Sequence, residues 1–341
     1  MTTLKELSKH LGLSVTQVSR ALNNHDDVSA KTKQRVKEAA KALNYHPNTA
    51  ARRLVTGRSG IVGLVYPYMP DQADAWYFTQ FVGGLSSRFS QHGMQFMLHM
   101  SDGPDRGLAI HDQLIRTRSI DGFVIIVPKA NDKRVQLLRE RKVPFVLHGQ
   151  TMDQPDYPFY DIDNVAVGYD LTRLLVDAGH KNIAFINGEA GDSFVERRFT
   201  GYRKALAEAG LKWRDEWQSC GTMTRELGLL ETVRMFQGSG AKPTAIVASN
   251  MLILQGIFDA AKALGLSIPD DLSVVAHDDD LPDCPVNMFP VPITCTRAPL
   301  VQSWEPLAQL LERYLKGAVL SDVQEIASHE LLERGSVRAL R

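Results

Sequence analysis

The sequence predicts an all-α head of about 46 residues followed by an α/β core of two doubly wound parallel-sheet lobes. Two observations lead to this prediction. The head contains three short segments whose apolar residues recur at helical spacing. From residue 61 onward, short apolar runs such as IVGLVYP alternate with helical segments at the spacing of βαβ units. The alternation continues through two consecutive sets of similar size, so we expect two lobes with a cleft between them.

The stretch TLKELSKHLGLSVTQVSRALN predicts two short helices joined by a tight turn. Gly12 ends the first helix, and Ser14 begins the second through a capping box with Gln17. The second helix leaves a small, polar and basic outer face, formed by Val15, Thr16, Gln17, Ser19 and Arg20. Such a pair describes a helix-turn-helix, and an ordinary helical hairpin is the alternative.

Charge is distributed unevenly along the chain. Residues 1–58 hold eleven Lys or Arg and four Asp or Glu, a balance of +7, and the remainder holds 28 and 35, a balance of −7. A third helix, which Ser29 begins, carries much of the basic charge. The head is therefore suited to binding a polyanion. The segment 47–60 is too short to be a stable isolated helix, so we interpret it as a hinge that becomes helical when something orders it.

Composition excludes several classes of protein. With 44% hydrophobic and 23% charged residues, no signal peptide and no membrane-length apolar run, a soluble cytoplasmic protein is expected. Three cysteines without metal spacing fit a reducing compartment. No dinucleotide-binding, P-loop or nucleophile-elbow motif is present, which argues against an enzyme, and we expect no cofactor. His277 and the three acids after it are too close together in sequence to predict a metal site.

The order of the predicted strands and helices divides the core between the two lobes. We expect the first lobe to contain about residues 61–162 and 292–320, and the second about 163–291 and 321–341. The closing HELLERGSV is expected to add a last strand to the second lobe. The helices are predicted at residues 77–92, 106–118, 132–141, 165–178, 195–209, 227–236, 252–264 and 300–316.

The head signature TLKELSKHLGLSVTQVSRALNN…VSAKTKQRVKEAAKALNYHPN resembles that of the LacI/GalR family of bacterial transcriptional regulators. The stretches GFVIIVP, DIDN, LLVDAGHKNIAFING, ERRFTGYRKAL and LLERGSV follow in the family's order, so the resemblance covers essentially the whole chain. It implies a periplasmic-binding-protein-like core and a homodimer on a near-palindromic DNA operator.

The same resemblance implies a ligand-responsive repressor of carbohydrate uptake or catabolism genes, released from its operator by a sugar or glycoside inducer. A purine-type co-repressor remains the alternative effector. A two-lobed sugar-binding protein without DNA function is the other alternative, and the first 58 residues argue against it.

DNA contacts follow from the resemblance residue by residue. Val15, Thr16 and Arg20 match the family's base-reading positions, and Arg20 can pair with a guanine edge or a phosphate. Leu54 matches a leucine that wedges into the minor groove, although a hydrophobic anchor of the linker is an alternative role. The other implied DNA-contacting residues are Thr3, Ser14, Ser19, Asn23, Ser29, Thr32, Asn48, Arg52 and Arg53.

The resemblance also implies an effector site in the cleft. Asp163 could instead be only a helix N-cap, and Asp278 only one of three solvated acids. Met251 and His277 depart from the family's usual residues, so the ligand of a familiar member cannot be assumed. The implied effector residues are Tyr66, Tyr77, Phe78, Asp163, Arg198, Met223, Asn250 and Asp278.

Overall fold

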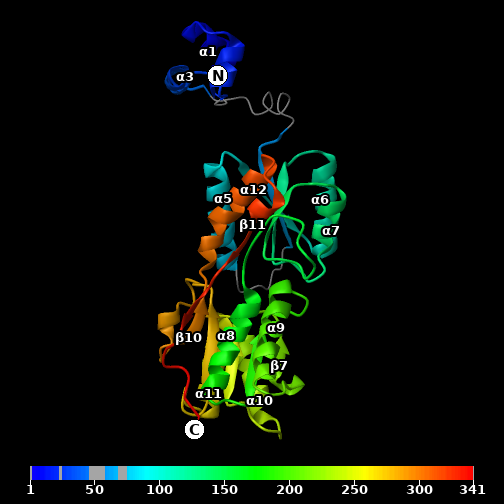
Figure 1. Ribbon diagram of the computed structural model, residues 1–341, viewed down its shortest axis with the longest axis vertical. Helices are drawn as coiled ribbons and strands as arrows, with labels where there is room; N and C mark the ends of the chain where they lie inside the picture. The colour runs from blue at the N-terminus through cyan, green and yellow to red at the C-terminus, as the bar shows by residue number, and fades with distance from the viewer. Residues whose placement is uncertain (1, 23–24, 46–57, 68–74, 341) are drawn as a thin grey trace. The chain divides into compact units, whose positions relative to one another are not determined.

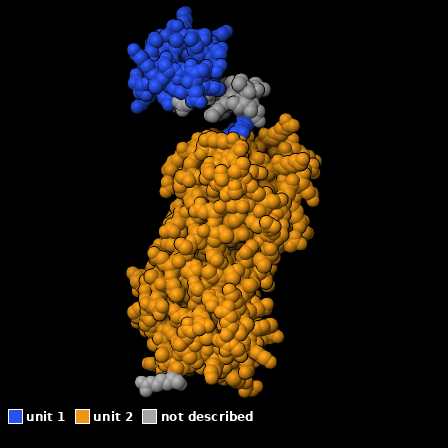
Figure 2. All heavy atoms as spheres, viewed as in Figure 1, with its two compact units in different colours: residues 1–60 blue, residues 61–341 orange. Residues whose placement is uncertain are grey.

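The computed structural model describes residues 2–22, 25–45, 58–67 and 75–340, without the side chains of residues 67 and 75–77. The chain separates into two compact units, Met1–Gly60 and Ile61–Arg341, which Figure 2 shows in different colours. Each unit encloses its own hydrophobic core. The unit that begins at Ile61 is itself built from two lobes, each with its own sheet.

Three helices form the first unit, α1 (Leu4–Leu11), α2 (Val15–Leu22) and α3 (Ala30–Ala42). Gly12 adopts a left-handed conformation (φ 64°) and ends α1. The predicted capping box begins α2, with Ser14 N–H donating to Gln17 Oε1 at 3.0 Å and Gln17 N–H to Ser14 Oγ at 3.1 Å. The helices enclose a small core of Leu7, Leu11, Val18, Ala21, Val36, Ala39 and Ala40. The predicted helix-turn-helix is confirmed.

The first lobe contains a six-stranded sheet in the order β11-β5-β4-β3-β1-β2. Its paired strands are all parallel. The strands are β1 (Ile61–Pro67), β2 (Gln95–Ser101), β3 (Gly122–Ile126), β4 (Phe145–His148), β5 (Phe159–Ile162) and β11 (Gln324–Ala327), and the helices are α5 (Ala75–Gln91), α6 (Pro104–Arg116), α7 (Lys133–Glu140) and α12 (Trp304–Leu315).

Helices cover both faces of this sheet, and the strands are apolar throughout for that reason. Along β3, Val124 and Ile126 pack toward α5 and α12, whereas Phe123 and Ile125 pack toward α6 and α7. Figure 1 shows the two helix pairs on opposite sides of the sheet. A strand buried on both faces cannot alternate polar and apolar residues, which explains the continuous apolar runs in the sequence.

The second lobe repeats this architecture in the order β12-β10-β9-β8-β6-β7. Only β12 is antiparallel to its neighbour. Helices α8 and α9 pack on one face, and α10 and α11 on the other. The strands are β6 (Ile183–Asn187), β7 (Gln218–Cys220), β8 (Ala245–Ala248), β9 (Ser273–Asp278), β10 (Thr294–Arg297) and β12 (Glu330–Leu332), and the helices are α8 (Asn164–Asp177), α9 (Ser193–Glu208), α10 (Arg225–Gln237) and α11 (Met251–Leu264).

Two short strands lie in the opposite lobe from the one that the sequence predicts. β10 was expected in the first lobe but pairs with β9 and β12 of the second. β11 was expected in the second lobe but pairs with β5 of the first. The chain therefore crosses between lobes near residues 298–299 and 328–329, and not near 292 and 320. The reason is that a four-residue strand carries no signal in its own sequence for which of two neighbouring sheets it joins.

Helices α8 and α9 touch backbone to backbone. A Cβ atom at Gly168 of α8 would overlap the carbonyl oxygen of Arg198, and one at Gly201 of α9 would overlap that of Val165. Only glycine permits this approach, because the neighbouring atoms belong to the main chain and cannot turn aside. The contact fixes the position of Arg198 relative to α8.

We expect Gly168→Ala to destabilise the core by roughly 2–3 kcal/mol or more, because the methyl group forces the two helices apart. Urea unfolding followed by circular dichroism measures the effect. Gly83→Ala is the matched control, since a Cβ at that helical position meets open space. Ala favours helix over Gly by roughly 1 kcal/mol, so the control should be neutral or stabilising. Equal stability of the two variants would contradict the close contact.

Candidate functional site

A cavity of about 670 Å³ lies between the lobes of the second unit. It opens at the carboxyl ends of the parallel strands, where Tyr66 lies near the end of β1, Val127 follows β3 and Asn250 lies two residues beyond β8. In both sheets this is where the strand order reverses, between β1 and β3 and between β6 and β8. Doubly wound sheets bind ligands at such switch points. The position of the cavity therefore identifies the candidate ligand site.

Arg198 of α9 is the central cation of this cavity. Its guanidinium is almost fully buried, with Nε donating to Asn164 Oδ1 at 2.9 Å and Nη1 to the carbonyl and hydroxyl oxygens of Ser249 at 2.6 and 3.0 Å. The ring of Phe194 lies 5.2 Å from the guanidinium carbon. Burial lowers the pKa of Arg198, and the charges of Asp279 and Asp161 oppose that shift. The site thus holds a rigid, desolvated donor.

Two carboxylates complement this cation. Burial raises the pKa of Asp161 to about 6, although its oxygens accept from Gln150 Nε2 at 3.1 Å and Asn164 Nδ2 at 3.0 Å. Burial also disfavours ionisation of Asp279, but the adjacent His277 and Arg198 outweigh it and hold the pKa below its usual range. One carboxyl group therefore titrates near neutral pH, and the other stays ionised.

Five of the predicted effector residues line the cavity: Tyr66, Phe78, Arg198, Met223 and Asn250. Tyr66 and Phe78 stack with ring centroids 4.3 Å apart, so the first lobe contributes an aromatic pair to the cavity wall. Asn250 uses Oδ1 to cap α11, accepting from Ile253 N–H at 2.9 Å, so its amide nitrogen is the group that can donate to a ligand. Tyr77 lies in α5, but its side chain is outside the described residues.

Two predicted effector residues do not line the cavity. Asp163 caps α8, accepting from Ala166 N–H at 2.9 Å, which is the alternative that the sequence left open. Asp278 is fully buried, so it is not the solvated acid that the sequence left as its alternative role. It accepts from Asp280 N–H at 2.8 Å and lies 3.5 Å from Arg297. In each case an acid one or two positions away, Asp161 or Asp279, occupies the cavity wall instead.

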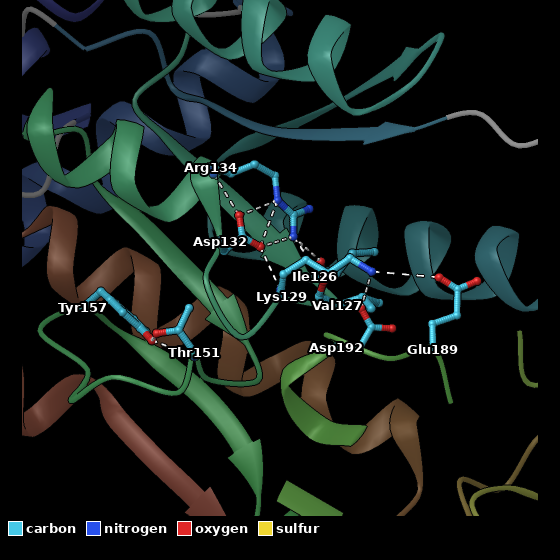
Figure 3. Close-up of polar contacts among 9 residues, drawn as sticks. All are labelled: Ile126, Val127, Lys129, Asp132, Arg134, Thr151, Tyr157, Glu189 and Asp192. Carbon is cyan, nitrogen blue, oxygen red and sulfur yellow. Dashed lines mark hydrogen bonds and ion pairs between the residues drawn. The ribbon is translucent and has the colours of Figure 1, made fainter. Parts of the chain in front are cut away.

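A group of contacts, the interlobe latch, joins the lobes beside the cavity (Figure 3). Lys129 Nζ of the first lobe lies 2.6 Å from Asp192 Oδ1 and 3.9 Å from Glu189 Oε2 of the second. Backbone hydrogen bonds accompany the ion pair, from Ala130 N–H to Gly191 and from Ser193 N–H to Pro128, at 2.8 and 2.9 Å. The latch is a set of breakable contacts at a ligand site.

The chain also crosses between the lobes at the wall of this cavity. Ile162, the pair Ala298 and Pro299, and Ser328 all line it, and each lies at one of the three crossings. The third crossing is anchored to α8, because His329 Nε2 lies 2.8 Å from Asp170 Oδ2. A ligand in the cavity therefore touches the segments that connect the two lobes.

The head presents the outward face of α2 that the sequence predicts. Val15, Thr16 and Arg20 are exposed on it, Ser19 is half-buried, and Ser14 caps the helix. Arg20 Nη2 lies 2.8 Å from Asp27 Oδ2, and about half of each side chain is exposed. Any base or phosphate that binds Arg20 must compete with Asp27.

The remaining predicted DNA contacts fall into two groups. Thr3 begins α1 through a capping box with Glu6. Ser29 begins α3 and accepts from Thr32 N–H at 3.2 Å, which places both hydroxyls at a helix N-terminus where phosphate is favoured. The others lie outside the described residues: Asn23, Asn48, Arg52, Arg53 and Leu54.

Comparison with known proteins decides the family. A family model described as bacterial regulatory proteins of the lacI family matches residues 3–48. A second, described as periplasmic binding proteins and sugar binding domain of LacI family, matches residues 59–289. The chain belongs to the LacI family. It is thus a ligand-responsive transcriptional repressor of carbohydrate genes, with a DNA-binding head and a sugar-binding core.

Matches to relatives cover nearly the whole length of this LacI-family regulator. It is 38% identical to the HTH-type transcriptional regulator AglR of Rhizobium meliloti, over 98% of this chain and 93% of AglR. It is 33% identical to RafR of Escherichia coli, over 81% of each chain. A solved CelR–cellobiose complex has a TM-score of 0.70 at 25% identity and covers 98% of this chain and all of CelR.

A lac repressor dimer bound to operator and an anti-inducer shares the fold, with a TM-score of 0.74 at 24% identity and 99% of each chain covered. Over the described part of the regulator, no helix is long and apolar enough to cross a membrane.

Several residues of the cavity escaped the sequence analysis. Asp161 and Asn164 flank the predicted Asp163 in DIDN, and recognising the short strand β5 would have placed them at a carboxyl end. Asp279 follows the last residue of β9, where side chains alternate between opposite faces. His111 and His148 carry no motif at all, and only the fold brings them to the cavity wall.

We expect Lys129→Met to loosen the interlobe latch, because it leaves Asp192 buried without its cation. Hydrogen exchange at the amides of Ala130 and Ser193 should then accelerate by several-fold to about tenfold, equivalent to about 1 kcal/mol. The amide of Val124, inside β3, should be unaffected. Lys181→Met, at an exposed position of the second lobe, serves as the control. Unchanged exchange at both latch amides would show that the ion pair does not hold the lobes.

Proposed function

We propose that this regulator binds a near-palindromic operator as a homodimer in the cytoplasm, and that a sugar or glycoside bound between its lobes releases it. The observation that supports the effector class best is the cluster of buried Arg198, Asp161 and Asn164 with half-buried Asp279, beside aromatic surfaces. Closely set donors and acceptors suit a polyol, whose hydroxyl groups each donate and accept, while aromatic rings suit the apolar face of a sugar ring. We assign the chain no catalytic step.

Each group has a role in this proposal. Arg198 donates to a ring or hydroxyl oxygen, and Asp161 and Asp279 accept from hydroxyl groups. Tyr66 and Phe78 pack against one ring face. The relative CelR, solved with cellobiose, supports a carbohydrate over other small molecules. Met223 and Phe194 supply the apolar surface of the second lobe.

Release follows from coupling between sites. A ligand shifts the regulator away from the operator only by the difference between its affinities for the DNA-bound and released lobe arrangements. Two kinds of connection hold the lobes together. The noncovalent contacts of the latch can break, whereas the three crossings are covalent and cannot. In the proposal, the hinge segment at residues 47–60, with Arg52, Arg53 and the Leu54 wedge, reports the lobe arrangement to the head.

The direct test is a thermal-shift screen against monosaccharides, disaccharides, glycosides, sugar phosphates and purines, followed by an operator-release assay with each ligand found. A ligand that binds only the native state raises the melting temperature. A sugar that both stabilises the protein and releases the operator supports the proposal. A purine that stabilises the protein and strengthens operator binding would replace it with the co-repressor alternative.

The pKa of Asp161 makes effector affinity depend on pH. A hydroxyl group that donates to the carboxylate stabilises its ionised form, so binding lowers the pKa from about 6 and releases a proton. Affinity should therefore rise with pH up to about 6 and level off above it. The two cavity histidines, His111 and His148, have pKa values of about 4 and stay neutral across this window.

Titration calorimetry between pH 5 and 8 measures this dependence. Asp161→Asn should bind more weakly and show no rise in affinity near pH 6. A wild-type affinity that is flat over this range, or a rise that survives in Asp161→Asn, would remove Asp161 from the ligand contacts.

In the head, Arg20 and Asp27 give a matched pair of variants. Arg20→Ala should weaken operator binding and relax preference at one base pair by roughly 1–3 kcal/mol. Asp27→Asn should strengthen binding, because it frees Arg20 and removes a negative charge facing DNA. Fluorescence anisotropy with the operator and with single-base substitutions measures both. If base preference is the same in Arg20→Ala as in the wild type, Arg20 does not read a base.

A further inference from the structure

His111 is a buried residue of the cavity wall that the proposed function leaves unused. It lies on α6 and is fully buried, with its ring 4.7 Å from that of Phe123. Its Nδ1 lies 2.7 Å from the carbonyl oxygen of Gly107, one helical turn earlier. A carbonyl oxygen only accepts, so Nδ1 carries the proton and donates to it.

The other ring nitrogen has nothing to bind within the described part of the protein. Burial, together with the charge of Arg134, lowers the pKa of His111 to about 4, so the ring is neutral at pH 7. With the proton on Nδ1, Nε2 is an acceptor, and it is buried without a hydrogen-bond partner among the described residues. Buried polar atoms are rarely left in this state, because the missing bond costs roughly 1–3 kcal/mol. Nε2 is therefore open to a donor from outside the described residues, such as a hydroxyl group of a bound ligand.

The cavity extends from Arg198 to this histidine. Its wall around α6 and the start of α7, the flank, comprises Ser101, Gly107, Leu108, His111, Asp132 and Lys133. A Cβ at Gly107 would come within 3.2 Å of Ser101 Oγ, so glycine lets α6 pack closely against the end of β2 at this wall. The flank adjoins the ends of β1 and β3, whereas Asp161 lies on β5, two strands from β3. Two strand spacings are roughly 10 Å, which is wider than one pyranose ring.

The volume of the cavity likewise indicates space for more than one sugar ring. At roughly 30 Å³ for each water molecule of the liquid, its 670 Å³ corresponds to about twenty waters. A pyranose has about twelve non-hydrogen atoms and a disaccharide about twenty-three, each occupying at most the volume of a water. One sugar ring would fill only part of the cavity, which has room for two rings.

We propose that the flank is a second sugar subsite, so that the effector is an oligosaccharide of at least two rings and a hydroxyl group of its second ring donates to His111 Nε2. This inference rests on the proposed sugar-effector function and adds the size of the ligand to it. The first ring lies at Arg198, Asp161 and Asp279, and the second lies over Gly107 and Leu108. A purine or a monosaccharide leaves His111 without a partner.

Titration calorimetry with sugars of increasing length tests the subsite. The probes are glucose, galactose, methyl α-glucoside and methyl α-galactoside, then maltose, cellobiose, sucrose and melibiose, then maltotriose and raffinose. We expect at least one disaccharide or trisaccharide to bind tenfold or more tightly than every single-ring probe. If a single-ring sugar binds as tightly as any longer one, the inference is wrong, although the proposed function stands.

Variants of His111 separate the subsite from the rest of the cavity. His111→Asn keeps an amide donor near Nδ1 for Gly107 but has no acceptor in place of Nε2. It should weaken the preferred oligosaccharide by about tenfold and leave single-ring affinity unchanged. His111→Gln, whose longer side chain carries its amide oxygen to the place of Nε2, should recover much of the loss. Equal weakening of all ligands by His111→Asn would reduce His111 to a structural role.

Leu108→Phe is the second approach, because it alters a half-buried side chain and leaves the histidine intact. The added ring fills the flank, so oligosaccharide binding should fall at least tenfold while single-ring binding persists. Melting temperatures identify any variant that fails to fold. Unchanged oligosaccharide affinity in Leu108→Phe would place the second ring elsewhere. If no sugar of any length binds the wild type, the proposed function itself fails, and this inference fails with it.

Discussion

The buried guanidinium of Arg198 is the constraint on which the ligand cavity depends. A guanidinium removed from water needs hydrogen-bond partners, and here groups from α8 and from the end of β8 accept from its Nε and Nη1. The backbone contact at Gly168 and Gly201 makes this possible, because it sets α9 close enough for Arg198 to reach Asn164. Two small residues in helices therefore determine the geometry of a polar site several residues away.

The sequence was sufficient for features that depend on local pattern. Periodicity, glycine at helix ends and the capping box placed the three head helices, and continuous apolar runs identified strands buried on both faces. These signals work because each can be recognised within a few residues of the chain, even where the packing behind it involves distant elements. The head and the doubly wound lobes were predicted for that reason.

Features that depend on partners distant in sequence were not predicted correctly. β10 and β11 are short, and either could have joined either sheet on the evidence of its own residues. The motifs indicate Asp163 and Asp278, but the direction of each side chain depends on where the preceding strand ends. A shift of one or two positions turns a ligand contact into a helix cap or a buried acid. His111 shows the limit most clearly, since only the fold reveals that its Nε2 acceptor has no donor among the described residues.

The three crossings between the lobes have a mechanical consequence. Three short connections side by side resist sliding and twisting of one lobe over the other, and they leave bending as the soft degree of freedom. The head precedes β1 in the chain, so it is tethered covalently to the first lobe alone. Ligands of different size should then set different angles between the two lobes and not create new kinds of motion. Changes in the cavity wall can therefore adjust how far such a protein responds to its ligand.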